Sequence, residues 1–366
     1  MAAHDPNDLE RPQRIKGRGA ASNPVGRFEP QRSTREDDGW YREDDDAVPR
    51  LATQVSIERA RRILSRNDSP DIPFNQSINP YRGCEHGCNY CYARPSHAYL
   101  NLSPGLDFET RLFAKTNAAE LLRAELAKPG YRCEPVNLGA NTDPYQPIEK
   151  TYRLTRQVLE VLAECHHPLT IVTKNALVER DLDLLAPMAE RGLAQVFISV
   201  GLLDNRLAST LEPRASAPHR RLQALGKLAA AGVPTGVLVA PIIPAVTDKD
   251  IEQIIERAAG LGVKAAGYTV LRLPHELKQV FREWLALHLP ERAEHVMNLL
   301  QSMRGGRDND PNFGSRMRGE GAYADMLAQR FKLACRKHGL VRTRQLPLDS
   351  SQFVPPRRPS PQGELF

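Results

Sequence analysis

The chain has 366 residues, enough to bury a large core as one barrel-sized domain with extensions or as two ordinary domains. Its 50 lysines and arginines outnumber its 44 acidic residues, and the formal net charge of +6 suits an anionic partner without requiring one. The first residues are polar and charged. We therefore expect neither a secretory signal nor a membrane span, and a cytoplasmic protein.

The N-terminal region is predicted to be a disordered, charged arm over residues 1–55. It mixes arginines with the acidic run Glu43–Asp46, holds few apolar side chains and contains KGRGAASNPVGRFEP. This composition is typical of a solvated tail, and an arm that grips phosphates through its arginines is the alternative. The run SIERARRILSR at residues 56–66 then predicts a short helix.

Three cysteines follow in one short stretch, Cys84, Cys88 and Cys91 within CEHGCNYCY. Gly83 and Gly87 suit a loop that reverses tightly around an iron–sulfur cluster. A 4Fe-4S cluster normally takes four thiolates. The remaining cysteines are scattered singly, at Cys133, Cys165 and Cys335. If they are not ligands, one iron keeps an open coordination position, and an open position is where chemistry occurs.

Other interpretations of the cysteines remain open. A zinc site would add His86 or His97, although structural zinc usually takes two separated ligand pairs. A redox dithiol formed by CNYC leaves Cys84 unexplained. A disulfide framework does not suit a long chain with six cysteines.

From the cysteines to Leu273, short β-branched runs alternate with longer helical patterns, which indicates βαβ units and a parallel sheet. The predicted strands are 78–83, 135–140, 169–173, 194–200, 234–240 and 265–270. The predicted helices between them are 117–126, 156–164, 178–190, 219–232 and 247–262. The pattern predicts an α/β fold, a partial (β/α)6 barrel over residues 56–275.

The C-terminal third of the chain is predicted to be helical and then disordered. Helical patterns at 282–290 and 323–339 indicate an extension over 276–342. Residues 343–366 are rich in proline and serine, which is typical of a disordered tail.

Polar side chains fall just beyond the carboxyl ends of the predicted strands, where βα barrels keep their functional groups. They are Asn141, Thr142, Asp143, Thr173, Lys174, Asn175, Ser199 and Arg272. Each alone could be a turn or cap residue, Asp143 before proline especially. Their joint placement with the cysteines predicts one site at one mouth of the barrel.

The stretch CEHGCNYCY, with the aromatic Tyr90 before the last cysteine, resembles the three-cysteine signature of the radical S-adenosylmethionine (SAM) superfamily. NTDPYQP, VTKN and SVGLLDNRLASTLEPR extend the resemblance over about residues 78–273, to the branch that contains spore photoproduct lyase. The resemblance implies a barrel of the radical SAM type. It also implies a 4Fe-4S cluster on Cys84, Cys88 and Cys91, with SAM bound at the open iron.

The same resemblance implies roles for the residues around SAM. It places Lys174 and Ser199 at the SAM carboxylate and Tyr92 at the cofactor. Asn141 and Thr142 correspond to the segment near the methionine amino group, although the usual Gly-Gly-Glu is not spelled out here. Arg214 would meet a carboxylate or lie in a solvated loop.

The implied reaction is reductive cleavage of SAM to methionine and a 5′-deoxyadenosyl radical, which abstracts hydrogen from a substrate. An external one-electron reductant of the flavodoxin or ferredoxin type would be the partner. The cysteine that donates hydrogen in the lyase corresponds to Ala140 here, which argues against photoproduct repair. A non-catalytic iron–sulfur protein for electron transfer or sensing, and a zinc-stabilised nucleic-acid module, are the alternative functions.

The substrate is unassigned, with DNA or RNA as a candidate class. Net charge and four arginines of a glycine-rich loop support a nucleic acid, namely Arg304, Arg307, Arg316 and Arg318. The same loop could instead cover the active site as a lid.

Overall fold

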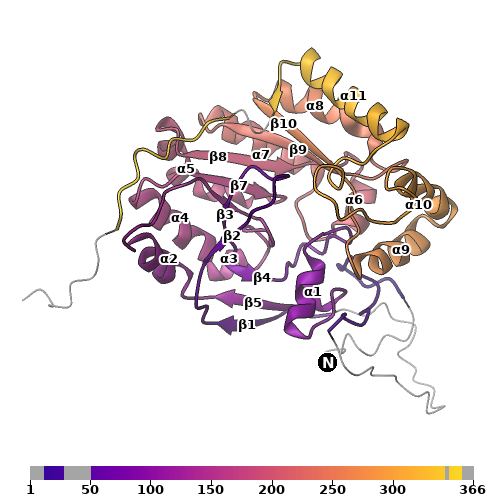
Figure 1. Ribbon diagram of the computed structural model, residues 1–366, viewed down its shortest axis with the longest axis horizontal. Coiled ribbons are helices and arrows are strands. Elements are labelled where there is room, and N and C mark those ends of the chain that lie inside the picture. Colours follow the sequence, from indigo (N-terminus) through magenta and orange to yellow (C-terminus); the bar gives the residue numbers. More distant parts are fainter. Residues whose placement is uncertain (1–11, 29–50, 343–345, 357–366) are drawn as a thin grey trace, which may run out of the picture.

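The computed structural model describes residues 12–28, 51–342 and 346–356 (Figure 1). The rest of the predicted N-terminal arm and C-terminal tail lies outside the described residues. No helix in these ranges combines the length and the apolar character that crossing a bilayer requires.

Among the described residues, an eight-stranded sheet forms the centre of the molecule, in the order β11-β10-β9-β8-β7-β6-β3-β2. Its parallel inner strands are β3 (Gln76–Ile78), β6 (Val136–Leu138), β7 (Leu169–Thr173), β8 (Ala194–Ser199), β9 (Thr235–Ile242) and β10 (Ala265–Val270). The predicted partial (β/α)6 barrel is confirmed. Two short strands extend its edges: β2 (Leu64–Arg66), antiparallel to β3, and β11 (Val341–Arg342), parallel to β10.

Helices connect the strands, as the sequence periodicity predicts. They are α2 (Ala118–Leu126), α4 (Leu154–Glu164), α5 (Leu182–Glu190), α7 (Pro218–Ala230) and α8 (Ile251–Gly260). Shorter pieces are α1 (Asp107–Thr110), α3 (Glu149–Tyr152), α6 (Asn205–Leu211) and the 3-10 turns η3 (Ala176–Asp181) and η4 (Asp248–Asp250). In α8 the residues Ile251, Ile254, Ile255 and Ala258 are buried, so the apolar face read from the sequence is the packed face.

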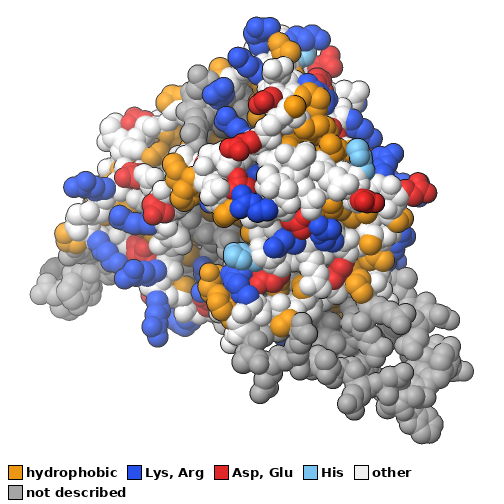
Figure 2. Space-filling model, turned by 45° about the vertical axis from the view of Figure 1, so that its right-hand side comes forward, with side chains coloured by type: hydrophobic (Ala, Val, Ile, Leu, Met, Phe, Trp, Pro, Cys, Tyr) orange, Lys and Arg blue, Asp and Glu red, His pale blue; other side chains and the backbone are white. Residues whose placement is uncertain are grey.

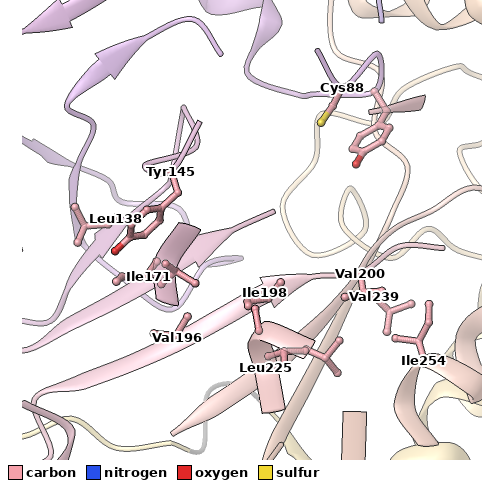
Figure 3. Packing of buried hydrophobic residues seen from close by; sticks show 14 of the residues in the cluster. Cys88, Leu138, Tyr145, Ile171, Val196, Ile198, Val200, Leu225, Val239 and Ile254 are labelled. Atoms are coloured by element: carbon pink, nitrogen blue, oxygen red, sulfur yellow. The ribbon is translucent and has the colours of Figure 1, made fainter. Parts of the chain in front are cut away.

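The aliphatic core fills the space between the sheet and these helices. Figure 3 shows Leu138 of β6, Ile171 of β7, and Val196 and Ile198 of β8, with Leu225 of α7 against them. These side chains are fully buried. Cys88 lies to one side of this layer in the same view, and its side chain is buried as part of the same core, so the cysteine loop is packed onto the core at this point.

A second, three-stranded sheet consists of β1 (Gln54–Glu58), β5 (Arg111–Lys115) and β4 (Tyr81–Arg82). The helix predicted at 56–66 is therefore wrong, because this stretch contributes to β1 and β2. Its backbone pairs with β5 and β3 instead of with itself, and such pairing overrides local helix preference. The strand predicted at 78–83 is likewise divided between the two sheets.

The predicted helical extension is present and gathers on the right of Figure 1. It contains α9 (Leu277–His288), η5 (Pro290–Arg292), α10 (Ala293–Ser302) and α11 (Ala322–Lys337). Tyr323 of α11 donates a hydrogen bond to Asp248 at 2.6 Å, and Arg330 pairs with Glu252 at 2.7 Å. These contacts fasten α11 to the start of α8.

Parts of both predicted tails lie against the core, contrary to the expectation of disorder. In residues 12–28 the side chains of Ile15, Ala20 and Ala21 are buried. In residues 346–356 the ring of Phe353 packs against the core, and the Val354 N–H donates to Cys165 O at 2.9 Å. Disorder was predicted because both segments contain few apolar side chains. Backbone hydrogen bonds, which cannot be deduced from composition, hold both segments in place.

Candidate functional site

The three predicted cluster cysteines lie in residues 83–92, the cysteine loop, between β4 and the 3-10 helix η2 (Arg94–Leu100). Cys84 and Cys88 are each 6% exposed, and Cys91 is half-buried. Gly87 has a φ of +70°, and a Cβ there would lie 2.7 Å from a Glu109 carboxylate oxygen. A left-handed backbone and a close neighbour both require glycine at this turn.

Backbone hydrogen bonds tie the cysteine loop to distant parts of the chain. The donors and acceptors are Cys84 N to Phe108 O (2.9 Å), Asn89 N to Leu211 O (3.2 Å) and Arg214 N to His86 O (3.1 Å). The loop is thus held at its start by α1, and at His86 and Asn89 by the end of α6 and the residues that follow it. Such anchoring keeps the three thiols in one arrangement.

A buried ion pair lies beside the second cysteine. Glu212 pairs with Arg221 at 2.9 Å and accepts a hydrogen bond from the Tyr90 hydroxyl at 2.6 Å. Arg221 also donates to the Ser199 carbonyl at 3.1 Å. The Lys174 ammonium lies 5.7 Å from the centre of the Tyr90 ring, a cation–π contact. Burial opposes a charge on Lys174, yet nearby Cys88 and Glu212 raise its pKa above the ordinary value.

A second carboxylate joins two strand ends to the cysteine loop. Asp143, after β6, accepts hydrogen bonds at 2.7 Å from the Thr173 hydroxyl and from the Lys174 N–H. His86 of the cysteine loop lies 3.3 Å from the same carboxylate. Burial opposes ionisation, but His86 and these donors lower the Asp143 pKa to about 2. Asp143 is thus more than a turn residue before Pro144.

Three of the residues predicted to bind SAM gather where β6 ends. Tyr92 is exposed, and its hydroxyl donates to the Ala140 carbonyl. Thr142 is buried and donates to the Gly83 carbonyl at 2.8 Å. Asn141 is exposed. The structure therefore brings these three side chains to the start and end of the cysteine loop.

The other predicted residues reach the cysteine loop by different routes. Lys174 does so through the Tyr90 ring, as described above. Arg214 pairs with Glu85 inside the loop, so the carboxylate that it meets belongs to the protein. Ser199 is 3% exposed, and its carbonyl accepts from Arg221, which links it to the loop through Glu212 and Tyr90. Arg272 follows β10 and contacts the Met317 sulfur at 3.4 Å.

The chemistry of these residues fits an iron–sulfur cluster with a bound zwitterion. Burial raises the pKa of Cys84 and raises that of Cys88 to about 12, so cluster binding must displace their protons. Asn89 is fully buried, and its side-chain amide has no hydrogen-bond partner in the described part of the chain. Within the same residues, Lys174 Nζ has no hydrogen bond either, which leaves a cation for an incoming carboxylate.

A compact mononuclear site has less support. No three His, Cys, Asp or Glu side chains in the described ranges converge as ligands of one metal ion. His86 faces Asp143, and the His97 Nε2–H donates to the Arg111 carbonyl at 2.9 Å. Burial lowers the His97 pKa to about 4. Both histidines offered for the zinc interpretation therefore have structural partners.

Sequence reasoning missed the buried charges that hold the cysteine loop. Arg94 and Glu109 form an ion pair in which both side chains are fully buried. Glu212 and Arg221 form the second pair. Of these four residues only Arg221 lies in a predicted helix, and a charged residue in a helical pattern is too common to single it out.

Comparison with protein families matches residues 78–258 to the Radical SAM superfamily. An uncharacterised protein of Mycobacterium tuberculosis is 41% identical over 232 residues, which cover 62% of this chain and 68% of that protein. An uncharacterised protein of Methanocaldococcus jannaschii is 28% identical over 221 residues, covering 60% of this chain and 79% of that protein.

Among solved structures, the fold is similar to that of spore photoproduct lyase complexed with dinucleoside spore photoproduct. The TM-score is 0.56 at 17% sequence identity, over 79% of this chain and 81% of the lyase. A mutant of that lyase with bound AdoMet and the dinucleoside gives a TM-score of 0.55 with the same coverage. At this level of identity the likeness establishes a shared fold.

Proposed function

The chain belongs to the radical SAM superfamily, as its motifs predict, and we propose that it is an enzyme that cleaves SAM reductively. Members of this superfamily typically bind a 4Fe-4S cluster and SAM. One observation carries the proposal: Cys88 and Cys91 of the three-thiol loop lie near the Lys174 ammonium, which has no hydrogen-bond partner among the described residues. A cluster that only passes electrons has no need of that cation.

The residues of the cysteine loop would hold the cluster. Cys84, Cys88 and Cys91 supply three thiolates, which leaves one iron of a 4Fe-4S cluster for SAM. Lys174 would neutralise the SAM carboxylate, and Ser199 would lie beside it. When bound, the cluster and SAM supply reductive bond cleavage with one electron from a flavodoxin- or ferredoxin-type donor, and hydrogen abstraction from the substrate.

Tyr92, Asn141 and Thr142 would form the wall of the same site at the end of β6. Thr142 orients the loop through the Gly83 carbonyl, and the exposed Tyr92 and Asn141 remain accessible to SAM. Arg214 would act indirectly, because its partner is Glu85 and it therefore shapes the cysteine loop. We propose a cytoplasmic enzyme, in keeping with a reduced cluster.

The reaction proposed here differs from photoproduct repair, because the chain lacks the cysteine that donates a hydrogen atom to the product radical in the lyase. Ala140 is at the position where the lyase resemblance calls for a cysteine, and its carbonyl accepts from Tyr92. Cys133 and Cys165 precede β6 and β7 and so lie toward the amino ends of the strands, opposite the cysteine loop. Neither thiol can replace the missing donor.

The glycine-rich loop, residues 304–321, is better suited to cover the barrel than to grip a nucleic acid. Arg304 is 2% exposed and donates to the carbonyls of Leu271, Ser315 and Arg316. Arg316 pairs with Asp71 at 2.5 Å, between β2 and β3. The Val270 N–H donates to Met317 O at 2.9 Å, at the other end of the sheet.

The glycine-rich loop thus spans from β10 to the β2–β3 connection, and only Arg307 and Arg318 of its four candidate arginines are exposed. On the face seen in Figure 2, lysines and arginines are interspersed with acidic side chains and form no continuous basic patch. DNA or RNA as substrate would have to show binding that weakens steeply with salt.

The test of the proposed function is anaerobic reconstitution with iron and sulfide, followed by SAM and dithionite. The wild-type chain should form 5′-deoxyadenosine, measured by chromatography. Cys88→Ala should lose both the cluster absorbance and the product, whereas the control Cys335→Ala, in α11, should keep both.

The variant Lys174→Ala tests SAM binding separately from cluster binding. It should keep the cluster and bind SAM about ten- to a hundredfold more weakly, because a charge-assisted hydrogen bond contributes about 1.5–3 kcal/mol. Unchanged SAM affinity in Lys174→Ala, or a cluster with no 5′-deoxyadenosine from the wild type, would favour the electron-transfer or sensing alternative.

A further inference from the structure

Residues 12–28, the N-terminal strap, lie against the cysteine loop although they precede it by more than fifty positions. Arg18 is 6% exposed, and Ala20 and Ala21 are 2% and 4% exposed. The strap contains GRGAASNP, whose low hydrophobicity predicts a tail. Its burial therefore depends on specific polar contacts.

The closest contact joins the strap directly to the backbone of the cysteine loop. A Cβ built on Gly19 would lie 1.7 Å from the Gly87 carbonyl oxygen and 3.4 Å from the Asn89 nitrogen. No side chain fits at Gly19 unless one of the two backbones moves. The close packing of the strap against the turn between Cys84 and Cys88 therefore requires glycine at position 19.

A chain of hydrogen bonds continues this contact to a cysteine. The N–H groups of Gly19 and Ala20 donate to the two Glu109 carboxylate oxygens at 3.0 and 2.7 Å. Glu109 is fully buried and pairs with the equally buried Arg94. Arg94 Nε donates to the Cys88 carbonyl at 2.8 Å. The strap, Glu109 and Arg94 therefore fix the backbone of the middle cysteine in series.

A second chain of contacts reaches the loop through Arg18. Its guanidinium donates to the Glu109 carbonyl at 2.9 Å and to the Thr53 hydroxyl at 2.8 Å. Thr53 in turn donates to the Glu85 carboxylate at 2.5 Å, and Glu85 pairs with Arg214. The guanidinium of Arg18 thus contacts Glu109 directly and Glu85 of the cysteine loop through Thr53.

The strap also bridges from the cysteine loop to the helical extension. Its contacts with α9 and the residue before it are Ser22 to Glu283 (2.6 Å), Arg14 to the Leu287 carbonyl (2.6 Å) and Arg27 to Glu276 (3.1 Å). The strap is therefore anchored at both of its ends, and the residues at its centre are held against the turn.

We propose that the N-terminal strap is a positioning element of the cluster site, which holds the Cys84–Cys88 turn and thereby sets the stability and reduction potential of the cluster. The effect on the cluster rests on the proposed function. The effect on the position of the cysteine loop does not. Groups that orient metal ligands typically change affinity about ten- to a hundredfold when altered. Backbone dipoles and solvent exposure near a cluster also set its potential.

The test compares Gly19→Ala with Gly260→Ala in the full chain. Gly260 ends α8, and a Cβ there meets nothing within 4 Å, so it is a matched control. In protein without cluster, hydrogen–deuterium exchange of residues 83–92 should be faster in Gly19→Ala and unchanged in Gly260→Ala. After reconstitution, Gly19→Ala should lose iron to a chelator about tenfold faster or more and show a shifted midpoint potential.

Arg18→Lys supplies a milder variant if Gly19→Ala does not fold. It keeps the charge but loses the fork, so iron loss should be faster than in wild type, whereas the exposed Lys16→Gln should behave as wild type. Wild-type exchange, iron loss and potential in a folded Gly19→Ala or Arg18→Lys would overturn the proposal. If the wild type binds no cluster, the proposed function fails, and the exchange of residues 83–92 still decides the role of the strap.

Discussion

At the carboxyl ends of the barrel strands the chain is held together by buried ion pairs, whereas at the amino ends it is held by neutral rings and backbone hydrogen bonds. Glu212–Arg221 and Glu109–Arg94 surround the cysteine loop, and no side chain of these pairs is more than 1% exposed. At the opposite end, the C-terminal segment 346–356 packs on residues that precede β6, β7 and β8.

The amino-end contacts centre on three rings. Phe353 lies 5.4 Å from both Tyr131 and His167, measured between ring centres. His167 is fully buried, and its Nδ1 must carry the proton that bonds the Pro168 carbonyl at 2.9 Å. Its Nε2 lies 2.7 Å from the Tyr131 hydroxyl, which also lies 3.0 Å from Gln76 Oε1. Burial lowers the pKa of His167 to about 4, so this histidine is neutral in the folded chain at neutral pH.

The difference shows what each end contributes. A buried ion pair gains little net stability over apolar packing, because both charges must be desolvated. Two such pairs around one loop indicate that position and charge matter there more than stability. The neutral end has no such groups among the contacts described, and in βα barrels it is the end that serves stability.

Breaking one ion pair should have the largest effect on folding. Glu212→Ala leaves the Arg221 charge buried without a partner, which should lower the free energy of unfolding by about 3–5 kcal/mol. Urea denaturation of the chain without cluster measures this. The control Glu252→Ala removes an exposed partner of Arg330 and should cost about 1 kcal/mol or less. Similar losses in both variants would contradict the contrast between buried and exposed pairs.

Acid should destabilise the folded chain through His167, at the amino end of the barrel. Burial lowers the His167 pKa from 6.5 to about 4, so the unfolded chain takes up this proton first as the pH falls. The free energy of unfolding should therefore drop between pH 6.5 and about 4, by about 3 kcal/mol from this group.

His167→Gln should remove that part of the pH dependence, and the exposed His219→Gln should leave it intact. The measurement is the difference in urea midpoint between each variant and the wild type across this pH range. Parallel curves for wild type and His167→Gln would show that His167 does not titrate as its burial requires.

Loosening the C-terminal segment should have the smallest effect. Phe353→Ala should lower the free energy of unfolding by about 1 kcal/mol, because its aromatic pairs contribute about that much. SAM affinity of the reconstituted protein should stay unchanged, since the segment lies at the far end of the barrel. Val354→Ala, more than half exposed, is the control. A matching loss of SAM affinity in Phe353→Ala would mean that the two ends are coupled.

Much of the fold followed from local patterns, and the errors have a common origin. The barrel strands and the buried face of α8 were predicted because their periodicity lies within single segments. The helix predicted at 56–66 failed because its residues pair with β5 and β3. The assignment of Arg304 to a nucleic-acid surface failed because that side chain is buried under its own loop.

The sequence by itself determined the three-thiol loop, the superfamily and the barrel, because each is written in neighbouring residues. Only the tertiary structure decided that Arg214 meets Glu85, that Arg94 and Arg221 are buried beside the cysteines, and that Gly19 touches the Gly87 carbonyl. These contacts join residues separated by many positions, and their partners exist only once the strands have closed around them. Charge and packing at such points depend on the fold and are not visible in any local pattern.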